Sequence, residues 1–205
     1  AYGNPRKGGI YAIEIREDDR LIEARITDGE NDILIGTREG KSIRFSEGDI
    51  RATGRKTMGV KGIALSSQSD FVVGMLVVKR EGTILVATEK GYGKRTDVIQ
   101  YRTQKRGGKG KSGIKTRDQD SVVQTLSVNT HTSVLFFSTQ GLVYKIKAWK
   151  IPESSALSKG KSLFNILPLK NHQSISSIMP LPEDKSEFKD LNIIGRRKNA
   201  TNIGA

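Results

Sequence analysis

The sequence contains no cysteine, which excludes disulfide frameworks, thiolate zinc sites and cysteine nucleophiles. Its two histidines, His131 and His172, lie far apart and without acidic residues at metal-ligand spacing, so no metal site is predicted. The longest apolar runs fall far short of the ~20 residues that a spanning helix needs, which excludes a transmembrane protein. No apolar leader is expected at the start, and the lack of cysteine fits a reducing cytoplasm.

Acidic residues are also scarce relative to basic ones. The 205 residues include 35 Lys and Arg against 22 Asp and Glu, a formal net charge of +13. Such a surface attracts polyanions, so nucleic acid and anionic membrane are the candidate partners. Only 6% of residues are aromatic, which provides few platforms for stacking single-stranded bases and favours contact with a duplex backbone.

Three similar apolar runs recur along the chain, at residues 33–37, 84–88 and 134–138. Each leads into a glycine (Gly40, Gly91 and Gly141) and then into a second β-type run. Because glycine adopts the left-handed conformation that tight turns require, each unit predicts a β-hairpin. Further strand candidates precede the hairpins, at residues 10–15, 21–26, 62–65, 71–76 and 122–128, and around Ile114.

A fourth, less regular copy is expected at residues 163–167, 175–179 and 191–194. About four short strands in every ~50 residues is the spacing of propeller blades. We therefore expect an all-β fold, a single propeller-like disc over residues 1–205 with repeats near 6–54, 55–104, 105–155 and 156–205. Two tandem β-sandwiches are the alternative.

The segments that join successive repeats are short, basic and rich in glycine. Because they recur once per repeat, a ring of blades would align them as one basic belt, and glycine lets backbone amides approach a phosphate that Lys and Arg neutralise. Flexible, soluble connectors are the simpler interpretation of any one segment. The belt comprises Arg6, Lys7, Arg51, Arg55, Lys56, Lys61, Arg102, Lys105, Arg106, Lys109, Lys111, Lys115, Lys159 and Lys161.

The charge is concentrated in the middle of the chain. Between Tyr92 and Arg117 there are nine cations, Lys94 and Arg95 among them, and one acid, Asp97. More than half of the net charge therefore lies in this stretch, which contains the third joining segment.

Within it, residues 104–110 read Gln104-Lys105-Arg106-Gly107-Gly108-Lys109-Gly110. This resembles the basic box Gln-(Arg/Lys)-Arg-Gly-Gly-(Arg/Lys)-Gly of the C-terminal domain of bacterial DNA gyrase A. Residues 89–96, 128–131, 136–144, 150–153 and 165–169 are also similar to the blades of that family. The resemblance covers nearly the whole chain.

The resemblance implies a β-pinwheel, a propeller-like disc whose blades exchange strands, that bends and wraps duplex DNA and so supports negative supercoiling by a type II topoisomerase. In the box, the glycines would shape the loop, Lys105, Arg106 and Lys109 would hold phosphates, and Gln104 would hydrogen-bond locally or to the DNA backbone. The implied partners are double-stranded DNA with little sequence preference, the other domains of gyrase A and the ATPase subunit, in the bacterial cytoplasm at the nucleoid.

The order of the repeats departs from the family. There the box belongs to the first of about six blades, whereas two full repeats precede it here. We expect a permuted order or an incomplete chain. The topoisomerase IV relative, which lacks an intact box, fits less well.

No constellation of catalytic residues is found. The sequence has no nucleotide-binding Gly-rich motif and no nucleophile elbow, and the acids of residues 118–120 read as turn residues. By the resemblance, a strand-cleaving tyrosine and an ATP site would lie on other domains or subunits. We expect no cofactor and no metal in this chain. The alternative function is a protein-interaction propeller whose basic rim docks an acidic partner.

Overall fold

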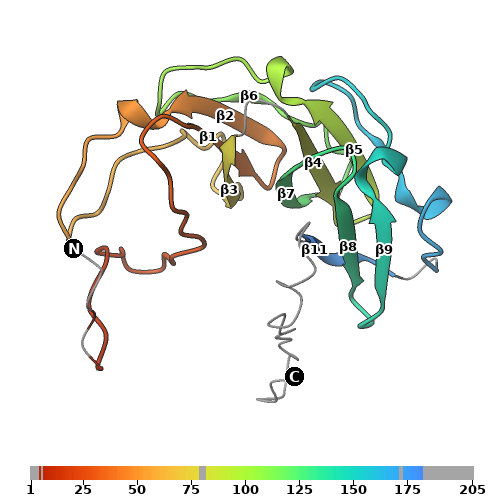
Figure 1. Cartoon of the computed structure of the whole chain (residues 1–205), viewed down its shortest axis with the longest axis horizontal. Helices are drawn as coiled ribbons and strands as arrows, with labels where there is room; N and C mark the ends of the chain where they lie inside the picture. The colour runs from red at the N-terminus through yellow and green to blue at the C-terminus, as the bar shows by residue number, and fades with distance from the viewer. Residues whose placement is uncertain (1–4, 6, 79–81, 171–172, 182–205) are drawn as a thin grey trace.

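The computed structural model describes residues 5, 7–78, 82–170 and 173–181. In this part of the chain the regular structure consists of antiparallel β-strands and short 3₁₀ helices. Three sheets stand side by side along an arc, with the strands that face the centre of the arc labelled β3, β7 and β11 (Figure 1). The strands are β1 (Asp32–Thr37), β2 (Lys41–Ser46), β3 (Val72–Val78), β4 (Thr83–Thr88), β5 (Tyr92–Asp97), β6 (Lys111–Ser112), β7 (Val122–Val128), β8 (Ser133–Ser138), β9 (Val143–Lys147), β10 (Lys161–Ser162) and β11 (Ile175–Pro180).

The three predicted hairpins are confirmed. They are β1–β2, β4–β5 and β8–β9, and the turn glycines Gly40, Gly91 and Gly141 have φ values of 84°, 77° and 83°. A 3₁₀ helix follows each hairpin: η1 (Glu47–Asp49), η2 (Val98–Gln100) and η3 (Ala148–Lys150). The hairpins are equivalent in register, because the last residue of each second strand pairs with the first residue of each first strand in all three.

The sheets exchange strands along the chain. The first sheet has the order β3-β1-β2-β6, and the second has the order β10-β5-β4-β7. The outer strand of the first sheet, β6, therefore comes from beyond the hairpin of the second sheet, and β10 relates to the third hairpin in the same way. This arrangement confirms the expected all-β pinwheel, in which the connectors tie neighbouring blades together.

Four of the expected strands are wrong. Residues 10–15, 21–26 and 62–65 are described without regular structure, and residues 163–165 form a 3₁₀ helix, η4 (Leu163–Asn165). Residues 10–26 form no strand pairing in the described structure: the Met75 amide of the edge strand β3 bonds the Glu23 carboxylate at 3.0 Å, and Ile26 is 98% exposed. An isolated pair of strands is marginally stable, so an alternating apolar pattern alone does not produce a sheet. The expected strand at 191–194 lies outside the described residues, and the repeat limits remain predictions.

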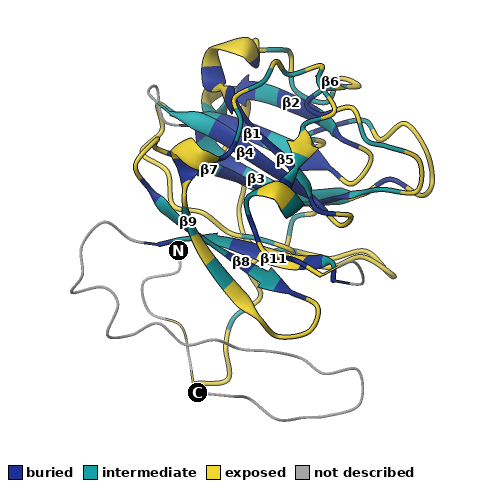
Figure 2. Cartoon of the chain, turned by 90° about the vertical axis from the view of Figure 1, so that its right-hand side faces the viewer, coloured by how far each residue is buried: buried dark blue, intermediate teal, exposed yellow. Residues whose placement is uncertain are grey.

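The core lies between neighbouring sheets. Leu34, Leu76, Ile84 and Val122 pack the first sheet against the second, and a larger cluster around Phe136 packs the second against the third. Buried residues accordingly gather in the central strands, while the loops at the edges are exposed (Figure 2). Each of these two clusters fixes one sheet against the next.

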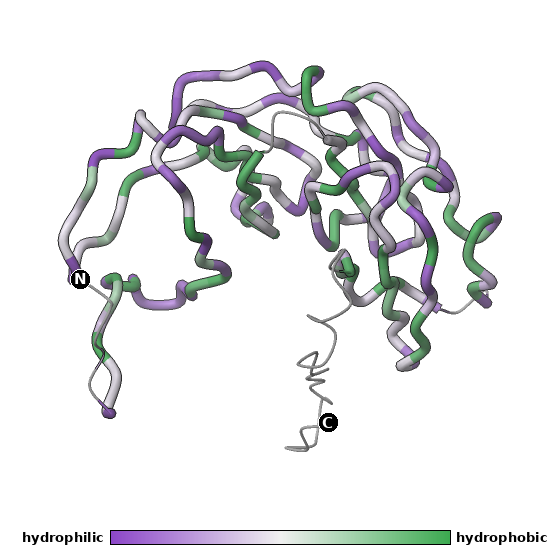
Figure 3. The backbone as a smooth tube through the Cα atoms, viewed as in Figure 1, coloured by the Kyte–Doolittle hydropathy of each residue, from purple (hydrophilic) through white to green (hydrophobic). Residues whose placement is uncertain are grey.

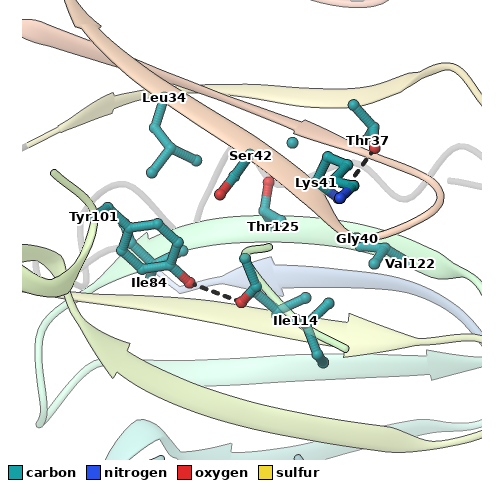
Figure 4. Close-up of a pocket in the computed structure, with 13 residues that line it drawn as sticks. Leu34, Thr37, Gly40, Lys41, Ser42, Ile84, Tyr101, Ile114, Val122 and Thr125 are labelled. Carbon is teal, nitrogen blue, oxygen red and sulfur yellow. Dashed lines mark hydrogen bonds between the residues drawn. The ribbon is translucent and has the colours of Figure 1, made fainter. Parts of the chain in front are cut away.

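A cavity of about 10 Å³ remains between the first two sheets, beside Tyr101 and Ile114 (Figure 4). A site for even one water needs at least this much space, with several polar partners. The Tyr101 hydroxyl already donates to the carbonyl oxygen of Gly113 at 3.3 Å. This cavity is a packing defect and has no room for a ligand.

Candidate nucleic-acid interface

Two basic connectors run along the outer, convex edge of the arc (Figure 1). The box connector (residues 101–112) follows η2 and ends in β6, and the second connector (residues 151–162) follows η3 and ends in β10. They have the same length. Each forms an isolated β-bridge to an arginine of the preceding sheet: Thr103 pairs with Arg44 in β2, and Glu153 pairs with Arg95 in β5. Hydrophilic stretches mark this edge in Figure 3. Consecutive sheets thus present equivalent loops on one side.

Both connectors end in the same four residues, Lys-Gly-Lys-Ser, at 109–112 and 159–162. Gly110 and Gly160 have φ values of 65° and 70°, in the left-handed region that glycine adopts most readily. A Cβ on Gly110 would lie 2.6 Å from the carbonyl oxygen of Ser42, and one on Gly160 would lie 2.9 Å from that of Gly93. Glycine is needed because each connector presses directly on the second strand of a hairpin, β2 or β5. Its flanking lysines are exposed in both loops.

The box connector is held by the preceding segment, residues 61–64, which we call the strap. The Gly107 amide donates to Gly62 O at 2.7 Å, and the Ala64 amide donates to Gly108 O at 2.8 Å. Arg106 donates from Nη1 to Lys61 O at 2.6 Å and from Nε to Asp49 O at 3.3 Å. The carbonyl oxygens of Lys61 and Asp49 therefore orient the Arg106 guanidinium, and the sequence did not reveal this role.

The second connector is held from beneath by a buried lysine. Lys94, in β5, is 0% exposed, and its ammonium donates to the carbonyl oxygens of Ser155 (2.7 Å), Ala156 (2.8 Å) and Ser158 (3.2 Å). Desolvation lowers the pKa of Lys94 to about 8, so the amine is mostly charged at pH 7. In β2 the equivalent residue in register is Ile43, which lies under the box connector.

Two of the nine cations between Tyr92 and Arg117, Lys94 and Arg95, are buried and add nothing to the basic surface. Arg95 is 7% exposed, and it donates from Nε to Ile151 O at 3.2 Å and pairs with Glu153 at 3.4 Å. Arg44 is its equivalent in the first sheet and pairs with Asp32 at 2.7 Å. For Lys94 the signal available was its alignment with the apolar Ile43 in the preceding repeat. These cations hold connectors and do not face solvent.

The other residues of the predicted belt are mostly exposed. Of the box, Lys105 and Lys109 are exposed, while Gln104 is half-buried and donates its backbone amide to Arg44 O at 2.7 Å. Gly107, like Gly110, has a positive φ, and Gly108 lies over Ile43. The remaining exposed members are Arg51, Arg55, Lys56, Lys61, Arg102, Lys111, Lys115, Lys159 and Lys161.

The belt is shorter than expected at its N-terminal end. Lys7 is exposed but belongs to residues 7–30, which run outside the sheets and pass the inner side of the arc, where Glu23 accepts a hydrogen bond from the Met75 amide at 3.0 Å (Figure 1). Residues 51–60 also leave the sheets before the strap returns. Arg6 lies outside the described residues. The structure therefore brings together the box connector, the second connector and the strap, but not Lys7.

The acids of residues 118–120 make a turn, as expected. Asp120 accepts hydrogen bonds from the amides of Lys90 (3.0 Å) and Ser121 (2.9 Å), and Asp70 accepts one from Glu39 at the equivalent turn (3.0 Å). Within the described ranges, no group of three or more His, Cys, Asp or Glu residues is placed to hold a metal ion. In the same ranges no helix is long and apolar enough to cross a membrane.

The sequence matches the family model of the DNA gyrase C-terminal domain, a β-propeller, over residues 31–79, 82–129 and 132–182. The chain belongs to this family. It is 35% identical to the DNA gyrase A protein of Haloquadratum walsbyi over 91% of the chain and 22% of that protein. It is 38% identical to the DNA gyrase A protein of Staphylococcus epidermidis over 87% of the chain and 20% of that protein. The chain thus spans about a fifth of the length of these relatives.

Solved structures support the same assignment. The C-terminal domain of DNA gyrase A superposes with a TM-score of 0.75 at 26% identity, over 86% of this chain and 59% of that one. The C-terminal domain of DNA topoisomerase IV has a TM-score of 0.80 at 20% identity, over 91% of this chain and 58% of that one, and shows the shared fold. The expected family and the expected pinwheel are both confirmed.

Proposed function

We propose that this chain binds duplex DNA along the outer edge of its sheets and bends it, and that this wrapping supports negative supercoiling by a DNA gyrase. One observation carries the proposal: two consecutive sheets present equivalent connectors, each with an exposed Lys-Gly-Lys sequence, along one convex edge. Exposed Lys105, Lys109 and Lys111 on one connector and Lys159 and Lys161 on the next follow a curved path that suits a bent backbone.

The energetics are those of phosphate contact without base reading. Bending 20–30 base pairs through 40–90° costs about 1–6 kcal/mol by elastic estimates. Each neutralised phosphate releases condensed counterions, and a protein with ~6–10 such contacts loses about 10³–10⁵ in affinity between 50 and 200 mM salt. The exposed connector lysines and arginines supply contacts of that number, so we expect weak sequence preference and a steep dependence on salt.

The partners and place in the cell follow from the relatives, which are gyrase A proteins roughly five times as long. We propose that the chain acts beside the other domains of gyrase A and with the ATPase subunit, on double-stranded DNA in the bacterial cytoplasm at the nucleoid. The wrapping itself uses no catalytic residue, cofactor or metal of this chain in our proposal.

The test removes the exposed lysines of the box connector. The variant Lys105→Ala/Lys109→Ala/Lys111→Ala retains Arg106, which holds the connector to the strap. A matched control, Arg16→Ala/Arg20→Ala/Arg25→Ala, removes the same charge from exposed positions that belong to neither connector. We expect the first variant to lower the slope of log affinity against log salt by about 2 to 3 and the control to change it little.

Duplex length separates wrapping from the alternative, a basic rim that docks an acidic protein. Wrapping predicts that affinity rises with duplex length until the edge is covered, and that closed-circular DNA relaxed in the presence of the protein keeps a changed linking number. Length-independent adsorption, with an unchanged linking number, would contradict the proposal and favour protein docking.

A further inference from the structure

The two connectors have the same length but orient their peptide groups differently. In the box connector the Gly107 amide points inward and donates to Gly62 O in the strap. Leu157 is the equivalent residue of the second connector, and its amide donates to no acceptor within the described ranges. Residues 112–115 are the equivalent of the strap, and the Lys115 amide donates to Ser158 O at 3.2 Å as the Ala64 amide does to Gly108 O, so the two connectors differ at Gly107 and Leu157. Lys94 adds three hydrogen bonds to the second connector.

Lys94 determines which way these peptide groups face. It attracts the carbonyl oxygens of Ala156 and Ser158 toward the interior. In a planar trans peptide the carbonyl and the following N–H point in opposite directions, so the amides of Leu157 and Lys159 face away from Lys94. The neighbouring Ala156 amide is already occupied by Gln100 Oε1 at 3.1 Å. Leu157 is 71% exposed, so its amide is open to a ligand from outside.

A groove of about 180 Å³ lies between the two connectors and joins them. From the box connector it is lined by Arg102, Gln104 and Lys111, and from the second connector by Ala156 and Leu157. Its described lining includes no acidic residue, and the cations Arg102 and Lys111 are exposed. Two exposed cations beside an outward-facing amide form the donor set that recognises a phosphate oxygen.

We propose that this groove binds a backbone phosphate of DNA, with Arg102 and Lys111 supplying charge from one connector and the Leu157 amide a hydrogen bond from the other. Lys94 is a positioning residue for that amide and does not touch the phosphate. The inference rests on the proposed function and deepens it, because it assigns one phosphate to the junction between two blades. A nucleic-acid backbone fits better than a free anion, since the groove opens onto the edge where both connectors expose further lysines.

The first experiment follows the backbone amides of the wild-type chain by NMR as a duplex of about 20 base pairs, the scale of a bent site, is added. We expect the Leu157 amide to shift and to gain protection from hydrogen exchange, and inorganic phosphate at the same phosphate concentration to produce a much smaller shift. An equal response to inorganic phosphate would overturn the assignment to a DNA backbone. No response of Leu157 to a duplex that does bind would overturn the site itself.

The second experiment compares Lys94→Met with Lys90→Met. Lys90 is exposed in the β4–β5 turn and hydrogen-bonds one carbonyl, Asp118 O, so the control removes the same charge at the far end of the hairpin. We expect Lys94→Met to lower duplex affinity about 3- to 10-fold more than Lys90→Met, and to leave the salt slope nearly unchanged because Lys94 neutralises no phosphate. Exchange should also accelerate at residues 155–159 in Lys94→Met alone.

Equal duplex affinities in the two variants would refute the positioning role of Lys94, and a slope lowered by about 1 in Lys94→Met would show direct phosphate contact instead. Circular dichroism and thermal unfolding establish whether Lys94→Met folds. If it does not, the wild-type response of Leu157 decides the question. Failure of the wild-type chain to bind any duplex would instead refute the proposed function, so the two failures are distinguishable.

Discussion

Replacing Gly110 by alanine tests whether the connectors depend on close backbone contact with the hairpin strands β2 and β5. Gly110 has a φ of 65°, and a Cβ there would lie 2.6 Å from the carbonyl oxygen of Ser42. Backbone cannot swing aside as a flexible side chain can. The connector must therefore move away from β2, and the pairing of Ser42 with Lys111 is lost.

The expected loss in the free energy of unfolding combines two costs, and other glycines of the chain allow them to be measured separately. The left-handed conformation costs an alanine about 1–2 kcal/mol. Displacing the connector breaks ladder hydrogen bonds, each of which contributes about 1 kcal/mol. Gly110→Ala should thus lower the free energy of unfolding by about 2–4 kcal/mol, and Gly160→Ala, with its Cβ 2.9 Å from Gly93 O, should cost a similar amount.

Two controls isolate the contributions. Gly141 has a φ of 83° but its Cβ would meet nothing within 4 Å, so Gly141→Ala should cost only the conformational part, about 1–2 kcal/mol. Gly54 is not left-handed and its Cβ would also meet nothing, so Gly54→Ala should be near neutral. Urea unfolding at equilibrium measures all four variants. A Gly110→Ala cost no greater than that of Gly141→Ala would refute the close-contact argument.

Three further outcomes are expected. Asp32→Asn removes the carboxylate that pairs with Arg44 and should lower the free energy of unfolding by about 1–2 kcal/mol in urea titrations, whereas an unchanged midpoint would mean that solvent replaces the pair. Burial raises the pKa of Tyr101 to about 12, so the folded state retains a proton that the unfolded chain loses near pH 10. Stability should therefore fall as the pH rises from about 10 to 12, and near-ultraviolet absorbance should show one tyrosine ionising late; simultaneous ionisation of all five would contradict this. Arg106→Lys cannot reproduce the two hydrogen bonds to Lys61 O and Asp49 O, so exchange should accelerate in the strap, and unchanged exchange would show that the guanidinium does not hold it.

The sequence alone determined the three hairpins, the repeat spacing and the basic box. These depend on local chemistry, because β-type runs on both sides of a glycine such as Gly40 form a hairpin with few competing solutions. The family resemblance depended on the same residues, and it is confirmed. The expectation that exposed lysines would recur in equivalent loops also needed only the repeat period, as Lys109 and Lys159 show.

Only the tertiary structure decided which strands share a sheet and which cations face solvent. The outer strands β6 and β10 have two residues each, too few for a sequence pattern, and they form because a neighbouring edge supplies hydrogen-bond partners. Residues 10–26 have a better pattern but form no strand pairing in the described structure, where the Glu23 side chain takes the Met75 amide of the edge strand β3. Lys94 is a charged residue in a basic stretch of the sequence, yet it is buried. Three carbonyl oxygens of a connector distant in the sequence replace the water around its ammonium. Local sequence sets what a segment can form, and the partners that folding brings to it set what it does form.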